Sequence, residues 1–106
     1  MLKNLGKGLI LLIASPLAFA GQDVLDTSVN YVYQLDSEST IFEFNSSVAN
    51  KCGSHLYRVK SPNVEVANRK FALVLTAFTA DKKLAFHDTE LCEGNRSVVA
   101  WVRLTK

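Results

Sequence analysis

Apolar residues recur at every second position in several short stretches of this chain, which constrains those stretches to β-strands. The alternation is clearest in residues 29–35 and 40–46, which are rich in β-branched and aromatic side chains and flank a polar break at residues 36–39. Two such runs joined by a short turn predict a β-hairpin. Three further strands are expected at residues 55–60, 84–87 and 98–104.

One segment has the helical period instead. Its apolar residues lie mostly three or four positions apart, at Val64, Ala67, Phe71, Val74, Leu75 and Phe78. This spacing predicts an α-helix of about four turns with one apolar face. Ser61 would cap its start, with Pro62 at the first helical position, and Asn63 is the alternative cap.

The element order is therefore β-β-β-α-β-β. It predicts a mainly β fold with one helix, a small OB-like five-stranded barrel whose helix covers the open end. An open α+β sheet with the helix on one face has the same order and is the alternative. The last strand is apolar on both faces, so we expect it to be central and covered twice.

In three segments the apolar residues have no regular spacing. We expect residues 21–28 to be a loose leading segment, and residues 45–54 and 88–97 to be polar loops. Glu43 is the one acid inside a predicted strand, and we expect its side chain to point outward from an edge.

The first twenty residues have the parts of a secretory signal peptide. Two early lysines precede the apolar run of residues 9–13, and Ala18-Phe19-Ala20 places small residues before a cleavage point. The segment is too short to be a convincing membrane span. We expect a signal peptide at residues 1–20, a single domain at residues 21–106, and a periplasmic or secreted location.

Removing that segment changes the charge. It leaves 86 of the 106 residues and lowers Lys+Arg from 12 to 10, which equals the 10 Asp+Glu. Nucleic-acid binding draws on an excess of positive charge, so we expect no nucleic-acid partner. We expect no membrane span in the mature chain either.

Cys52 and Cys92 are the two cysteines of the chain. In a secreted protein an isolated pair predicts one disulfide. It would close a loop of about 40 residues and contribute about 4 kcal/mol on the chain-entropy model. That is a large share of the total of about 5–10 kcal/mol expected for a small domain.

No residue pattern points to catalysis. His55 and His87 are isolated from any nucleophile motif, and the adjacent Ser54 and His55 would point to opposite faces of a strand. We therefore predict a protein that is not an enzyme and has no catalytic, metal-binding or cofactor-binding residues.

The aromatic residues on predicted strands are the candidate contact residues. Tyrosine, tryptophan and arginine are enriched at interfaces and suit stacking on glycans. The candidates for binding or subunit contact are Tyr31, Tyr33, Tyr57, Arg58, Trp101 and Arg103. The alternative is that the rings fill the barrel and pack under the helix.

The second half of the chain also carries a family resemblance. The stretch Cys52-Gly53-Ser54-His55-Leu56-Tyr57-Arg58-Val59, the helix around residues 70–80, Lys82-Lys83-Leu84, Cys92 and Val102-Arg103-Leu104 together resemble a recurring type of small secreted bacterial protein. The layout is similar to the B subunits of pentameric toxins of the subtilase-cytotoxin kind. Asp81 stands where that type usually has a glycine. The resemblance implies a disulfide-containing OB-fold that binds glycans, and it transfers no glycan-contacting residue.

Two functions follow as expectations. The first is a non-enzymatic secreted or periplasmic binding module that forms a homo-oligomer and binds glycans. The alternative is a monomeric periplasmic inhibitor or accessory protein that contacts a protein partner through residues 45–54 and 88–97.

Overall fold

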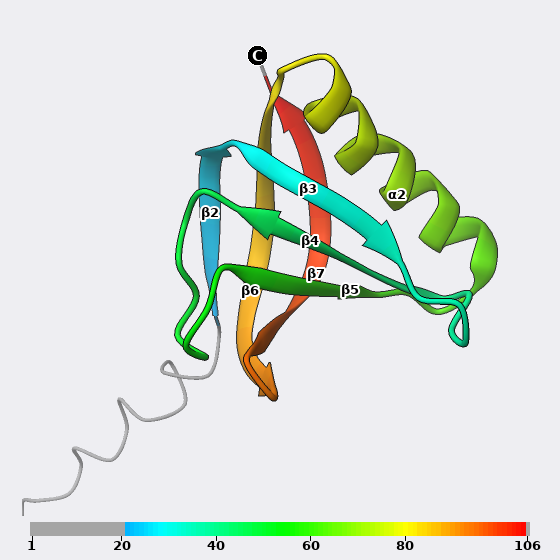
Figure 1. The fold of residues 1–106 in the computed structure, drawn as a ribbon, viewed down its shortest axis with the longest axis horizontal. Helices are drawn as coiled ribbons and strands as arrows, with labels where there is room; N and C mark the ends of the chain where they lie inside the picture. The colour runs from blue at the N-terminus through cyan, green and yellow to red at the C-terminus, as the bar shows by residue number, and fades with distance from the viewer. Residues whose placement is uncertain (1–20, 106) are drawn as a thin grey trace, which may run out of the picture.

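The computed structural model describes residues 21–105, which form a loose β-barrel with one helix across it (Figure 1). The predicted signal peptide lies outside the described residues. The elements in chain order are β2 (Gln22–Thr27), β3 (Val29–Gln34), β4 (Ile41–Ser46), β5 (Leu56–Lys60), α2 (Val64–Thr79), β6 (Lys83–Glu93) and β7 (Arg96–Thr105).

The six strands described form one sheet in the order β2-β6-β7-β5-β4-β3. All neighbours are antiparallel except β5 and β7, which run parallel because α2 connects β5 to the β6–β7 hairpin. The edge strands β2 and β3 are separated only by Ser28, so the sheet curls back on itself at this corner (Figure 1). No strand ladder joins these two edges, and the predicted OB-like barrel is therefore incompletely closed.

Hydrogen bonds hold the corner between β2 and β3. Ser47 donates its backbone N–H to the Ser28 carbonyl at 2.9 Å, and the buried Thr27 hydroxyl donates to the Leu84 carbonyl at 3.1 Å. Asp26 adopts a left-handed φ of +54°, which sharpens the bend. Residues 21–28 were expected to be loose, and this expectation is wrong because β6 supplies a pairing partner for β2.

The expectation of a loop at residues 88–97 is also wrong. Strand β6 continues to Glu93 and β7 begins at Arg96, so only Gly94 and Asn95 form the turn. The register of β6 against β7 shifts between Asp88 and Cys92, which marks a bulge. Polar residues are compatible with strands here because this hairpin projects from the barrel (Figure 1).

Aromatic rings fill the barrel. The rings of Phe44, Tyr57 and Phe86 pack against one another, with pairwise centroid distances of 4.6–5.5 Å. All three side chains are fully buried. The Tyr57 hydroxyl donates to the Val48 carbonyl at 2.9 Å. Burial and the nearby Asp88 carboxylate raise the pKa of Tyr57 to about 12.

Helix α2 begins at Asn63, whose side chain accepts a hydrogen bond from the Val66 N–H at 2.9 Å. Of the two predicted caps, the structure uses this one. Just beyond the helix, Asp81 has a left-handed φ of +54°. That conformation explains why a glycine suits this position.

The buried face of α2 differs from the predicted stripe. The residues that are buried are Ala67, Val74 and Ala77. Phe71 lies at the margin, with its ring 5.2 Å from that of Phe42, and the remaining large residues of the stripe are exposed: Val64, Leu75 and Phe78. Beside the two alanines, Phe71, Leu73 and Val74 supply the larger apolar contacts of the helix with the core.

Strand β7 is central, as expected, since it lies between β6 and β5. The expectation that both its faces are covered is wrong, because Ala100 and Arg103 are exposed. A register shift between β6 and β7 places Val99 and Val102 both on the buried side.

Candidate functional site

The outer face of β3, β4 and β5 carries an unusual row of polar and aromatic side chains. Side chains alternate along a strand, so Glu43, between the buried Phe42 and Phe44, points away from the aromatic core. Strand register places Tyr33 beside Glu43 and Glu43 beside Arg58. Three side chains of different chemistry are thereby aligned across three neighbouring strands.

Glu43 lies at the centre of this row and is fully buried. Arg58 donates to its Oε2 from Nε and Nη2, both at 2.6 Å. Arg96, at the start of β7, donates from Nε to both carboxylate oxygens at 3.0 and 2.9 Å, and the Tyr33 hydroxyl also bonds to Oε1. Glu43 was expected to be an outward-facing edge residue; it is instead covered by the side chains that bind it.

The network continues toward the β6–β7 turn. Arg58 donates from Nη1 to Glu93 at 2.8 Å, and Lys60 binds the other oxygen of Glu93 at 2.7 Å. We call these six residues, Tyr33, Glu43, Arg58, Lys60, Glu93 and Arg96, the Glu43 cluster. Its members come from β3, β4, β5, β6 and β7, so only the folded sheet brings them together.

The cluster favours the ionised form of its central acid. Burial opposes ionisation of Glu43, but hydrogen bonds from Tyr33, Arg96 and Arg58 outweigh it and lower its pKa. Burial, together with the bond to Glu43, raises the pKa of Tyr33, which therefore keeps its proton and donates it. The hydrogen bonds from Lys60 and Arg58 lower the pKa of Glu93.

A second tyrosine of β3, Tyr31, lies beside this cluster. Tyr31 is 45% exposed, and its ring stacks on that of Tyr33 at a centroid distance of 6.1 Å. Asn45 donates to the Tyr31 hydroxyl at 3.4 Å and accepts a hydrogen bond from Asn30 at 2.8 Å. An exposed ring with amide groups at its rim is thus available on an open surface.

The predicted contact residues divide into three groups. Tyr31, Tyr33 and Arg58 lie together on the outer face just described. Tyr57 is fully buried in the core, so its ring is not accessible to a ligand. The remaining two, Trp101 and Arg103, lie on β7 away from this face.

Trp101 and Arg103 contact one another. The Arg103 guanidinium lies 5.4 Å from the centroid of the Trp101 ring, and the His87 ring stacks on the same indole at 6.2 Å. His87 Nδ1 is in turn 2.7 Å from the Asp23 carboxylate. These side chains link β2, β6 and β7, and their groups are engaged with each other.

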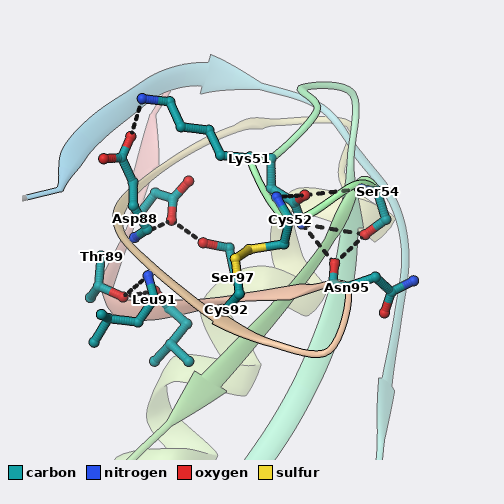
Figure 2. Close-up of a disulfide and its surroundings, with 12 residues drawn as sticks. Lys51, Cys52, Ser54, Asp88, Thr89, Leu91, Cys92, Asn95 and Ser97 are labelled. Atoms are coloured by element: carbon teal, nitrogen blue, oxygen red, sulfur yellow. Dashed lines mark hydrogen bonds and ion pairs between the residues drawn. A yellow bond between two sulfur atoms is a disulfide. The ribbon is translucent and has the colours of Figure 1, made fainter.

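The disulfide ties the other end of the barrel. Cys52 and Cys92 are bonded, as predicted, with their Cα atoms 5.6 Å apart (Figure 2). Close by, Lys51 pairs with Glu90 at 2.9 Å. On the same strand the buried Asp88 accepts hydrogen bonds from the Ser97 hydroxyl and from the Glu90 N–H (Figure 2).

Asn50 organises the loop that carries Cys52. Its amide nitrogen donates to the carbonyls of Leu56 and Asn95 at 2.7 and 3.0 Å, and its oxygen accepts from the N–H groups of Cys52 and Ser54 at 2.8 and 3.0 Å. The Ser54 hydroxyl also donates to the Asn95 carbonyl at 2.5 Å (Figure 2). We call residues 47–55 and 89–95 together the disulfide tip.

The described part of the chain offers surfaces rather than cavities. Residues 21–105 form no pocket, and they contain no group of three or more His, Cys, Asp or Glu side chains arranged to hold a metal ion. Helix α2 is not long and apolar enough to cross a membrane. The Glu43 cluster and the adjacent Tyr31 therefore form the candidate site with the richest binding chemistry.

Sequence reasoning missed four members of this site: Glu43, Lys60, Glu93 and Arg96. The one local signal was an acid between two phenylalanines in a strand, opposite a tyrosine across a hairpin. No protein-family model matches the chain, and no curated protein matches it at a significant level.

Proposed function

We propose that this protein is a non-enzymatic, secreted or periplasmic binding module that recognises a glycan on the outer face of β3, β4 and β5. The observation that carries the proposal is the fully buried Glu43, which fixes Tyr33, Arg58 and Arg96 on one open surface. Side chains that are already ordered lose little entropy when a ligand binds.

The chemistry of the face favours sugars. Pyranose rings present both C–H groups, which pack on aromatic faces, and hydroxyl groups, which need hydrogen-bond partners. Tyr31 supplies an exposed ring, Asn30 and Asn45 supply amide groups near its hydroxyl, and Arg96 supplies a guanidinium elsewhere on the same face. The resemblance to glycan-binding toxin subunits supports the same proposal and adds a homo-oligomer as part of it.

Nuclear magnetic resonance titration would test this proposal. The protein would be recovered from the periplasm after expression of the full-length chain, labelled with ¹⁵N, and screened against a panel of mono- and oligosaccharides. We expect shifts confined to β3, β4, β5 and the start of β7. We also expect Tyr31→Ala to weaken binding about two- to tenfold, since ring stacking contributes about 0.5–1.5 kcal/mol.

Phe78→Ala is the matched control. Phe78 is an aromatic residue with the same 45% exposure as Tyr31, but it lies on α2. It should leave sugar binding unchanged. Equal loss in both variants, or sugar-induced shifts confined to α2, would contradict the proposed face. Light scattering on the same sample measures the oligomer: a closed ring supports the toxin-like assembly and a monomer removes it.

The disulfide tip favours a second candidate function, binding of a protein partner by a monomer. The specific observation is the rigidity of the tip, in which Asn50, Ser54 and the disulfide all join the loop to the β6–β7 hairpin. Rigid exposed loops bind proteins at low entropic cost. Leu91 is 60% exposed on this tip and would be its apolar contact. A monomer that binds no sugar would favour this function over the first.

A further inference from the structure

Most charges of the Glu43 cluster are compensated within it. Arg58 directs Nε and Nη2 to Glu43 and Nη1 to Glu93, so all three of its nitrogens donate hydrogen bonds. Lys60 binds the second oxygen of Glu93. These two cations are therefore held by the two carboxylates.

Arg96 retains donors that the protein does not use. Its Nε bonds to Glu43, its Nη1 bonds to the Asn95 side-chain oxygen at 2.9 Å, and its guanidinium also donates to the Tyr33 hydroxyl. A guanidinium has five N–H donors, so these contacts leave some of them free. The cluster has three cations against two carboxylates, which leaves one positive charge in excess. The Arg96 side chain is 32% exposed, so its guanidinium is in contact with solvent.

The free end of Arg96 is also held in place. Glu43 anchors the Nε side from a fully buried position on β4, and Asn95 anchors Nη1 at the hairpin turn. A guanidinium fixed in this way offers planar donors without the entropy loss of a mobile side chain. Tyr33 shares the Glu43 carboxylate with Arg96, and Tyr31 stacks on Tyr33, so a pair of aromatic rings adjoins the carboxylate that holds Arg96.

We infer that Arg96 is the specificity-determining residue of this face, and that its ligand is a sugar unit carrying a carboxylate or a sulfate. The inference rests on the proposed function and names the ligand class. Guanidinium groups form short, charge-assisted hydrogen bonds with such anions, whereas a neutral sugar offers only hydroxyl oxygens. The bordering rings favour an anion that is attached to a sugar ring over a free inorganic ion.

Matched sugars separate this inference from the proposed function. The probes are galactose, galacturonate and galactose 6-sulfate, titrated into the ¹⁵N-labelled protein at low ionic strength. We expect at least one anionic sugar to bind about 10–100-fold more tightly than galactose, as hydrogen bonds to charged groups contribute about 1.5–3 kcal/mol. This preference should shrink with added salt. The two anionic probes distinguish a carboxylate from a sulfate ligand.

Arg96→Gln should abolish the preference, and Arg103→Gln is the matched control because it removes the same group from another part of β7. Should Arg96→Gln fail to fold, the Arg96 Nε resonance of the unaltered protein gives the same information: it should shift with an anionic sugar and not with galactose. Equal binding of neutral and anionic sugars at Tyr31 would overturn the inference and leave the proposed function standing. Binding of no sugar at all would overturn both.

Discussion

Replacing Glu43 with glutamine measures what the buried carboxylate contributes to stability. Glutamine keeps the shape of the side chain but removes the negative charge. The carboxylate accepts hydrogen bonds from the Tyr33 hydroxyl, from Arg58 at 2.6 Å, and from Arg96 at 2.9 and 3.0 Å. Its replacement leaves two arginines side by side without their shared anion.

The expected loss follows from burial. Removing one partner of a buried ion pair costs about 3–5 kcal/mol. Here Arg58 and Arg96 are 23% and 32% exposed, and Arg58 keeps Glu93, so water and Glu93 recover part of that cost. We therefore expect Glu43→Gln to lower the free energy of unfolding by about 2–3 kcal/mol. For a domain of this size that is a fall of about 10–20 °C in Tm.

Urea and thermal unfolding at pH 7 would measure this loss, with Glu93→Gln as the control. Glu93 has the same chemistry in the same cluster, but its side chain is 35% exposed. Exposed ion pairs contribute at most about 1 kcal/mol, so this variant should unfold close to the unaltered protein. Equal losses in the two variants would refute the view that Glu43 anchors the cluster through its burial.

Three further changes test other parts of the structure. The folded state lowers the pKa of Glu43 below its ordinary value of 4.5, so the cluster should stabilise the protein above about pH 4.5 and lose that effect as the pH falls. Urea midpoints measured from pH 7 to pH 3 should therefore fall less steeply in Glu43→Gln than in the unaltered protein. The pair Cys52→Ser and Cys92→Ser should lower the free energy of unfolding by about 3–4 kcal/mol, measured in oxidising buffer; full stability of that pair would exclude a structural role for the disulfide. Asn50→Ala should cost about 2 kcal/mol and increase hydrogen exchange at the disulfide tip, whereas the exposed Asn68→Ala on α2 should cost little; similar effects of the two would contradict the role given to Asn50.

The elements that could be predicted from the sequence are those with a strong local signal. Strands β3 and β4 alternate apolar and polar residues, β5 and β7 are short runs that contain β-branched and aromatic residues, and α2 has a helical period. Strand β2 lacks such a signal, since its Val24 and Leu25 are adjacent and flanked by aspartates. It forms because β6 pairs with it, and residue spacing within β2 does not reveal that partner.

The candidate site depends even more than β2 on residues that lie far apart in the sequence. Tyr33, Glu43 and Arg58 lie within one β-meander, so a correct register would have aligned them. Arg96 lies 53 positions from Glu43 and reaches it only because β5 pairs in parallel with β7. A sequence pattern records neither that pairing nor the burial of Glu43, which explains why this acid was expected at an exposed edge.

The Glu43 cluster is better explained by positioning than by stability, and one variant separates the two. Replacing a buried ion triad with apolar residues of similar volume is often neutral or stabilising by about 1–4 kcal/mol, so stability alone does not require charges here. We expect the triple variant Glu43→Leu, Arg58→Met, Arg96→Met to fold with a free energy of unfolding similar to or above that of the unaltered protein. It should nevertheless lose binding of anionic sugars, because nothing then fixes Tyr33 or supplies the guanidinium donors. Urea unfolding and the sugar titration, performed on the same sample, distinguish positioning from stability. A triple variant that is much less stable would show that the cluster holds the barrel together. A triple variant that still binds anionic sugars would show that the ligand face lies elsewhere.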